Sequence, residues 1–136
     1  MIKKKGKQNT SGSSKSKSSI GKANRRKGNA FEREVCKRLR ELGYDVATSR
    51  ASDRSLDAQK CDVVSLDEKL PTTIQCKYTR NTPNYFEIRS SCPIQDKPFT
   101  ILWKKSGESG QHSPGTVAIL DIEFFYHLLE NEVNKS

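Results

Sequence analysis

Two short apolar runs in the middle of the chain carry polar side chains, and they constrain the fold more than any other feature. Asp62 lies in the run Cys61–Val64, and Gln75 and Lys77 lie in the following run, Thr72–Tyr78. Side chains alternate along a strand, so Gln75 and Lys77 share one sheet face and the apolar residues of their run share the other. A carboxylate, an amide oxygen and an ammonium from neighbouring strands can therefore converge on one point. Hydrolysis of a phosphodiester with Mg²⁺ needs such a set.

The N-terminal segment is a strongly basic arm. Residues 1–28 hold ten Lys or Arg and no Asp or Glu, so the other 108 residues, with 15 basic and 16 acidic groups, account for −1 of the net +9. Lysine runs set among Ser and Gly cannot bury enough apolar surface to fold alone. A mean hydropathy of −0.82 leaves room for one modest core. We expect a disordered basic arm over residues 1–26 and one domain over residues 27–136.

The basic arm indicates a polyanionic partner. Nucleic acid fits best, because a flexible cationic arm gains affinity from counterion release without reading sequence. Alternatively, the arm is a solubilising or artificial tail with no partner, and a membrane surface is a third possibility. The N-terminus has no apolar stretch typical of a signal peptide, and no segment has membrane-spanning length. We therefore expect a cytoplasmic, nucleoid-associated protein, or one acting in the host cytoplasm if it is viral, that makes no membrane contact.

The four cysteines, Cys36, Cys61, Cys76 and Cys92, do not have the spacing of a metal or disulfide framework. They are 25, 15 and 16 residues apart and include no C-x-x-C pair. Zinc fingers and small disulfide scaffolds have tighter spacing. Three of the four lie in apolar patterns, which favours reduced, buried cysteines that act as small hydrophobes over a structural zinc site.

Hydrophobic periodicity and turn residues predict a small mixed sheet flanked by helices, which is an α/β fold. Gly43 is the expected C-terminal stop of the first helix, and Asp121 is a candidate cap of the last. The predicted elements are a helix over 28–43, strands over 44–49, 61–66 and 72–78, a short helix over 83–91, strands over 99–103 and 116–120, and a helix over 121–134, with irregular segments at 50–60 and 104–115.

The first predicted helix supplies another acid. At 100° per residue Glu32 falls within the apolar stripe near Leu39, whereas Glu34 points to the opposite side. An inward carboxylate needs a partner, because burying it unpaired costs several kcal/mol. A metal ion, or a basic group near one, would supply that partner. A salt bridge to Arg40 or Lys77 is the alternative.

Asp62 and Lys77 allow the same two interpretations. Strands disfavour Asp, so Asp62 indicates a site, although pairing with a loop arginine such as Arg50, in the preceding segment 50–60, would also explain it. Beside two carboxylates Lys77 would stay protonated and hold a water or phosphate oxygen. The order of helix acid, strand acid and Q-x-K strand carries more weight than any one of them.

These segments resemble the PD-(D/E)XK nuclease superfamily. Within it, the closest likeness is to archaeal-type Holliday junction resolvases, whose chains open with a lysine-rich arm and a K-G-x-x-x-E-R helix. The likeness covers about residues 25–80 and implies a restriction-endonuclease-like core. The matching segments are Lys27–Glu34, Leu39–Val46, Arg50–Ser52, Cys61–Val64 and Ile74–Lys77.

The resemblance assigns roles to individual residues. It makes Glu32 and Asp62 the acids of a Mg²⁺ site, where Mn²⁺ can substitute, and Lys77 the catalytic lysine. Gln75 takes the position of the third ligand, with the backbone carbonyl of Cys76 completing the set. The superfamily usually has an acid at the position of Gln75, but Q-x-K variants occur in Mrr-like enzymes. A glutamine carbonyl can bind Mg²⁺ but brings no charge, so we expect weaker metal affinity.

The sequence as a whole predicts a Mg²⁺-dependent endodeoxyribonuclease that cuts branched DNA such as four-way junctions. A two-fold homodimer is expected from function and family, because symmetric cleavage needs two active sites. A DNA-binding module with a decayed site and a basic RNA-binding protein are the alternatives. The predicted DNA contacts are Lys22, Arg25, Arg26 and Lys27 of the arm and Arg50, Ser52 and Arg54 of the loop.

Overall fold

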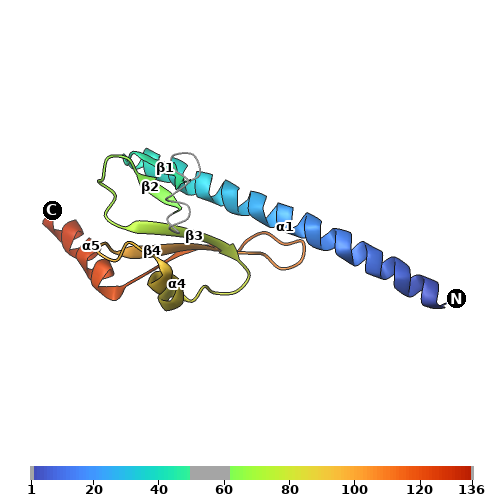
Figure 1. Cartoon of the computed structure of the whole chain (residues 1–136). Helices are drawn as coiled ribbons and strands as arrows, with labels where there is room; N and C mark the ends of the chain where they lie inside the picture. Colours follow the sequence, from blue (N-terminus) through green and yellow to red (C-terminus); the bar gives the residue numbers. More distant parts are fainter. Residues whose placement is uncertain (1, 50–61, 136) are drawn as a thin grey trace.

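The computed structural model describes residues 2–49 and 62–135, with side chains described from residue 21 onward. A mixed five-stranded sheet, in the order β1-β2-β3-β4-β5, is flanked by helices, as the sequence predicts (Figure 1). The elements are α1 (Ile2–Glu41), β1 (Val46–Thr48), β2 (Val63–Ser65), β3 (Thr73–Thr79), α4 (Tyr85–Ser91), β4 (Phe99–Lys105), β5 (Gly115–Leu120) and α5 (Ile122–Asn134).

The sheet combines antiparallel and parallel pairing. β1 pairs with β2, β2 with β3 and β4 with β5 in antiparallel fashion, while β3 and β4 run parallel. Parallel neighbours need a crossover connection, and α4 lies in it. In the parallel register Gln75 lies beside Ile101 and Lys77 beside Trp103, so these four residues share one face of the sheet.

Helix α1 is longer than predicted, because it begins at Ile2 rather than near Gly28. It ends as expected at Gly43, whose φ of +105° suits glycine, and the amide of Tyr44 bonds back to the Leu39 carbonyl at 3.0 Å. The N-terminal part projects far beyond the sheet (Figure 1). Most helices in proteins are stabilised by packing against the rest of the molecule. The part of α1 that projects beyond the sheet lacks such packing and is rich in Ser and Gly, which are weak helix formers, so only its own backbone hydrogen bonds stabilise it. Its ordering on a polyanion stays a prediction.

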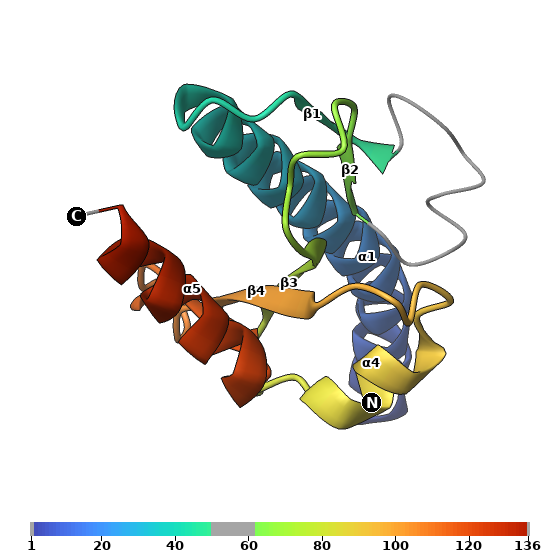
Figure 2. The same ribbon diagram turned by 90° about the vertical axis from the view of Figure 1, so that its left-hand side faces the viewer.

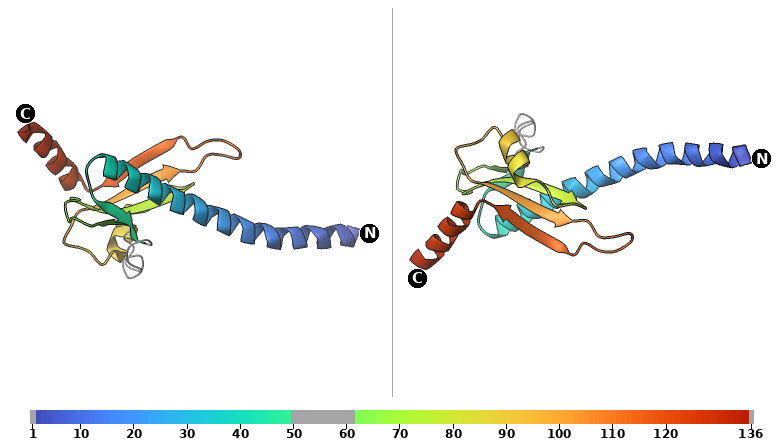
Figure 3. Two further views of the ribbon diagram at one scale, coloured as in Figure 1. Left: turned by 90° about the horizontal axis from the view of Figure 1, so that it is seen from above. Right: turned by 90° about the horizontal axis from the view of Figure 1, so that it is seen from below.

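One face of the sheet is covered by α1, which crosses it as seen from above in Figure 3. The Arg40 side chain joins the helix to β1 by donating from Nε to the Val46 carbonyl at 3.0 Å. The core on this side consists of Phe31, Val35, Cys36, Val46, Val63, Leu70, Ile74 and Cys76.

The opposite face is covered by α4, which Asn84 caps by accepting a bond from the Glu87 amide. Cys92, Phe99 and Ile101 form the buried core there, and the Tyr85 hydroxyl donates to the Phe99 carbonyl at 2.9 Å. Cys36, Cys76 and Cys92 are free and buried, which confirms their predicted role as small hydrophobes. Cys61 lies outside the described residues.

Helix α5 follows β5 and stands apart from the rest of the body (Figure 2). Asp121 caps it as predicted, accepting a bond from the Glu123 amide at 2.9 Å. Of the described residues of α5, Phe124 alone is buried. The helix is therefore attached to the sheet mainly at its first turn.

Candidate active site

Asp62 lies just before β2, where its backbone is held between two strands. Its N–H donates to the Ile74 carbonyl of β3 at 3.1 Å, and its C=O accepts from the Ser49 amide at 3.0 Å. The side chain is buried, and its Oδ2 accepts a hydrogen bond from the Cys76 amide at 2.8 Å. The carboxylate thus lies at the edge of β3 that faces β2, between the two faces of the sheet.

The Cys76 carbonyl lies on the same edge as this carboxylate. In an extended strand the N–H and C=O of one residue point to the same neighbour, and the Cys76 N–H points to Asp62. The predicted backbone ligand and the predicted strand acid are therefore neighbours. The sequence placed them within one site, and these contacts bring them together.

Glu32 approaches β3 from the α1 face. It is buried, as the helical spacing predicts, whereas Glu34 and Glu41 are exposed. Its charge acts on the thiols of both Cys36 and Cys76. Glu32 and Asp62 therefore both lie near Cys76, which is the residue between Gln75 and Lys77.

The two thiols beside these acids are held protonated. Burial raises the pKa of the Cys76 thiol far above its ordinary value, and the charges of Asp62 and Glu32 raise it further. Burial also raises the pKa of Cys36, against an opposing effect of Arg40. A thiolate nucleophile is thus disfavoured at both positions.

Gln75 is buried, and its Oε1 is the one buried side-chain oxygen or nitrogen among the described residues that has no hydrogen-bond partner there. An unsatisfied buried acceptor costs about 1–3 kcal/mol, so its retention requires an explanation. An amide oxygen is also a normal ligand of a hard cation. The chemistry of this position therefore fits the predicted ligand role.

Lys77 is half-buried and lies on the same face as Gln75, opposite α1. Within the described part of the chain no carboxylate lies within ion-pair distance of its ammonium. The Cys76 amide thus binds Asp62, and Glu32 lies close enough to act on the Cys76 thiol through its charge, while Gln75 and Lys77 flank that residue on the other face. Asp62 lies at the edge of β3, between the two faces of the sheet, so groups on either face can approach its carboxylate.

The predicted ligand set carries little negative charge. In residues 2–49 and 62–135 no three His, Cys, Asp or Glu side chains cluster so as to hold a metal ion. The predicted set contains only two such side chains, and its other members are amide and carbonyl oxygens. All of these ligands are oxygens, which favours Mg²⁺ or Mn²⁺ over zinc.

The predicted DNA contacts divide into two groups. Lys22, Arg25, Arg26 and Lys27 are exposed on α1, where it leaves the sheet. Arg50, Ser52 and Arg54 lie outside the described residues.

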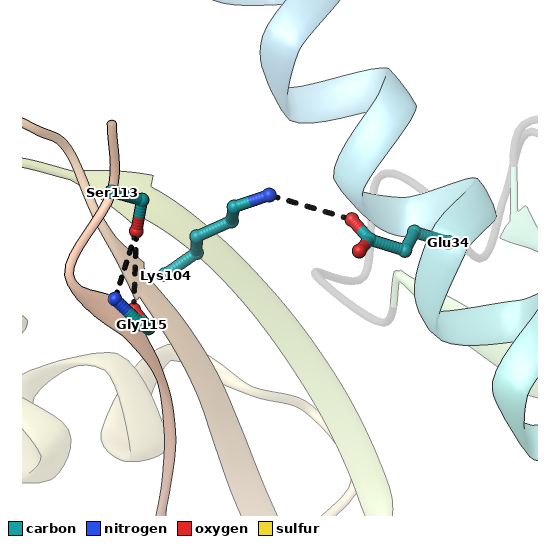
Figure 4. Close-up of polar contacts among 4 residues, drawn as sticks. All are labelled: Glu34, Lys104, Ser113 and Gly115. Carbon is teal, nitrogen blue, oxygen red and sulfur yellow. Dashed lines mark hydrogen bonds and ion pairs between the residues drawn. The ribbon is translucent and has the colours of Figure 1, made fainter. Parts of the chain in front are cut away.

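The sequence analysis did not identify Lys104, because it placed this residue in an irregular segment. In the structure β4 continues to Lys105 and includes it. The Lys104 ammonium lies 5.7 Å from the Phe31 ring centroid, 5.2 Å from that of Tyr78 and 3.5 Å from a Glu34 oxygen. Figure 4 shows this side chain reaching from β4 toward α1. Lys105 and Arg80 lie nearby at the same end of β3 and β4, since Thr79 and Lys105 are register partners. The parallel pairing of β3 and β4 brings these basic residues to one end of the sheet, and the sequence alone does not show that pairing.

A cleft of about 510 Å³ lies between α4, the start of β4 and α5, lined among others by Phe86, Arg89 and His127. None of the four predicted catalytic side chains lines it. The four predicted catalytic residues lie instead at the edge of β3 and on its two faces.

The fold and this edge define the class of protein. A mixed sheet between helices, with an acid before β2 and a Q-x-K sequence on β3, is the arrangement of the PD-(D/E)XK nuclease superfamily. The family model described as archaeal Holliday junction resolvase matches residues 23–90, which is half of the chain. The chain belongs to this family. Searches of curated proteins and of solved structures gave no match. Among the described helices, none has the length and apolar character needed to cross a bilayer.

Proposed function

We propose that the protein is a metal-dependent endodeoxyribonuclease that hydrolyses phosphodiester bonds in branched DNA, four-way junctions above all. Family membership supports the nuclease chemistry and the junction substrate. The observation that carries the metal site is the buried Gln75 Oε1 without a protein partner, one residue from the amide that bonds Asp62.

The metal ligands would be Asp62 Oδ1 or Oδ2, Gln75 Oε1 and the Cys76 carbonyl. Glu32 lies on the α1 face, opposite Gln75, so it would act on this set through its charge across the edge of β3 rather than as a ligand beside Gln75. A bound Mg²⁺ would lower the pKa of an attacking water and offset charge on the phosphate in the transition state. The Cys76 N–H orients the Asp62 carboxylate, because it fixes one of the two oxygens. Lys77 would hold the attacking water or a phosphate oxygen with its ammonium.

Gln75 sets the expected metal requirement. With Glu32 and Asp62 as its only carboxylates, the site has one negative charge fewer than the superfamily pattern. We therefore expect activity to require millimolar Mg²⁺ or Mn²⁺ rather than micromolar concentrations.

The basic groups would bind the DNA backbone. The exposed Lys22, Arg25, Arg26 and Lys27 on α1 form one basic surface. The partly buried Lys104 and Lys105 at the end of β4 add a positive charge on each face of the sheet. Phosphate contacts of this kind position DNA without reading its sequence. A two-fold homodimer would present two such sites to the paired strands of a junction. The protein would act on DNA in the cytoplasm or nucleoid, or in the host cytoplasm if it is viral.

A second function, binding of branched DNA without cleavage, is favoured by two observations. Gln75 replaces the usual acid, and no described carboxylate pairs with the Lys77 ammonium. In that case the same fold and basic surfaces would remain, and the β3 edge would hold no catalytic metal.

A cleavage assay separates the two functions. Wild type, Asp62→Asn and Lys77→Ala are incubated with labelled four-way junction, linear duplex, single-stranded DNA and RNA in Mg²⁺, Mn²⁺ or EDTA. We expect metal-dependent cutting of the junction, reduced at least about 100-fold by either substitution. Glu34→Gln and Lys69→Ala, which change exposed charges away from the β3 edge, are the matched controls and should keep full activity.

Binding of the junction without cutting in any metal would favour the second function. Preference for RNA, with indifference to both substitutions, would contradict both functions and favour a basic RNA-binding protein.

A further inference from the structure

The sheet face opposite α1 is buried where β3 and β4 begin and open where they end. On β4 this face includes the fully buried Ile101 and, further along, the half-buried Trp103 and Lys105. On β3, which runs parallel, Lys77 is half-buried and Thr79 is exposed. The ends of both strands extend past α4 (Figure 1). We call Lys77, Thr79, Trp103 and Lys105 the open sheet face.

Trp103 is held in one orientation on this face. Its Nε1 donates to the Thr79 hydroxyl oxygen at 3.0 Å and to the Thr79 carbonyl at 3.2 Å. The side chain also packs against the edge of the core that contains Ile101. A ring that is fixed before binding loses little conformational freedom when a ligand uses it. Trp103 therefore presents a preorganised aromatic surface beside Lys77, which is its register partner on β3.

The charged groups of the open sheet face are both positive. They are Lys77 and Lys105, and the Lys105 ammonium lies 5.8 Å from the Trp103 ring centroid. The exposed Glu108, in the loop after β4, lies 3.8 Å from the Arg80 guanidinium, which balances its charge. A flat ring between cationic groups suits an anionic ligand that itself carries a flat ring. A nucleotide meets both conditions.

We propose that the open sheet face binds one unpaired nucleotide of the DNA substrate, with the base stacked on the Trp103 ring and the adjoining phosphate on the Lys105 ammonium. The inference rests on the proposed function and specifies its substrate, which is branched DNA with an unpaired base beside the phosphate that Lys77 would hold. A paired base is stacked inside its duplex, so it cannot offer its flat face to the ring.

The base would take the place of the Lys105 ammonium over the ring. Stacking on an aromatic side chain strengthens binding roughly 5- to 150-fold per base, whereas an ammonium over a half-exposed ring gains roughly 2- to 5-fold. The base therefore displaces Lys105 from Trp103. The displaced ammonium stays within reach of the phosphate that follows the base, because both lie at the same end of the sheet.

The chain contains a single tryptophan, so its fluorescence reports on this face alone. The full-length protein is titrated in EDTA with three four-way junctions that differ at one position beside the branch. The first is fully paired, the second has one extra unpaired thymine, and the third has an abasic spacer in place of that thymine. We expect the thymine junction to bind at least about fivefold more tightly than the abasic junction and to quench Trp103 more strongly.

Variants separate stacking from packing. Trp103→Leu keeps apolar bulk but has no aromatic face, so it should bind the thymine and abasic junctions equally. Trp103→Phe restores a ring and should recover part of the preference. Phe86→Ala is the matched control, because it removes an 80% exposed ring on α4, outside the open sheet face. It should keep the full preference for thymine.

The phosphate contact has its own test. Lys105→Ala should weaken the binding of the thymine and abasic junctions alike and lower the slope of log K against log salt by about one. Lys69→Ala, which removes another lysine on the exposed turn between β2 and β3, is its control and should leave both quantities unchanged. An unchanged salt slope in Lys105→Ala would remove the phosphate contact from the inference.

Equal binding of the thymine and abasic junctions by the wild type would overturn the inference, and this comparison depends on no variant. So would a preference that survives Trp103→Leu, or one that is lost in Phe86→Ala. All of these measurements are made without metal, so absence of cleavage leaves them standing. Cutting of the junction without any preference for the unpaired thymine would keep the proposed function and reject the inference. Asp62→Asn should keep the preference whether or not the wild type cuts DNA.

Discussion

Cys76 links the candidate site to the stability of the fold. Its amide positions the Asp62 carboxylate, and its thiol lies buried near the charges of two acids. The folded state therefore keeps this thiol protonated at pH values where an unfolded cysteine, with an ordinary pKa of 9.0, loses its proton. A raised folded pKa contributes stability that is present below the unfolded pKa and is lost as pH rises.

We predict that the free energy of unfolding falls above about pH 9 by up to about 1.4 kcal/mol per pH unit from this one group. Cys76→Ala removes the group and should flatten the decline, although it lowers stability at neutral pH by leaving a small cavity. Urea unfolding of both proteins from pH 7 to pH 10.5 measures the difference. Parallel declines in the two proteins would show that Cys76 does not titrate in this way.

Gln75 offers a test of charge in the ligand set. Gln75→Glu would restore a third carboxylate and should lower the metal concentration for half-maximal cleavage by at least about tenfold. Without metal the added buried charge should reduce the melting temperature, and Mg²⁺ should raise it again. Thermal melts with and without Mg²⁺ and a metal titration of cleavage measure both effects. An active wild type beside an inactive Gln75→Glu would show that the position is not simply a ligand.

At the scale of elements, Lys104 of β4 contacts α1 through Glu34 and Phe31. Its ammonium lies over two rings and beside Glu34, but Glu34 is 66% exposed and such ion pairs are worth little. The ring contacts of a side chain only 25% exposed should dominate.

We therefore expect Lys104→Ala to cost about 1–2 kcal/mol of unfolding free energy and Glu34→Gln less than about 0.5 kcal/mol. Chemical denaturation of the two variants measures this difference. Equal losses in both would assign the stability to the ion pair, and Lys69→Ala controls for the loss of an exposed lysine.

Most of the element order could be predicted from sequence because local rules govern it. The period of Phe31, Val35 and Leu39 marks the helix that packs on the sheet, Gly43 ends it, and Asp121 caps α5. Local rules could not find the N-terminal extent of α1, since nothing in a Ser- and Lys-rich segment favours a helix over other backbone states.

The site could be predicted only in part. The buried Glu32 follows from helical spacing, and Asp62 and Gln75 follow from polar residues in apolar strands. Two features depend on pairing between distant segments, which spacing does not reveal. One is the Asp62 bond to the Cys76 amide, and the other is the basic end around Lys104.

For the whole molecule, the basic arm should control affinity for DNA rather than chemistry. Removing residues 1–21 deletes six lysines, at positions 3, 4, 5, 7, 15 and 17, and leaves the candidate site untouched. We predict that the slope of log K against log salt for DNA becomes shallower by up to about five. The cleavage rate at saturating DNA should stay within about twofold, because these charges act in binding.

Fluorescence anisotropy across salt concentrations and single-turnover cleavage measure these two quantities. A truncated protein with normal affinity but a lost cleavage rate would place the arm in the active site instead.

The most direct test of the central claim is where a divalent ion binds. In a ¹⁵N-labelled sample titrated with Mn²⁺, paramagnetic broadening falls on amides close to the ion. We predict selective loss of the amide signals of Asp62, Gln75 and Cys76, and no such loss in Asp62→Asn. Broadening confined to the glutamates of α5, or the same pattern in wild type and Asp62→Asn, would contradict a metal site at the edge of β3.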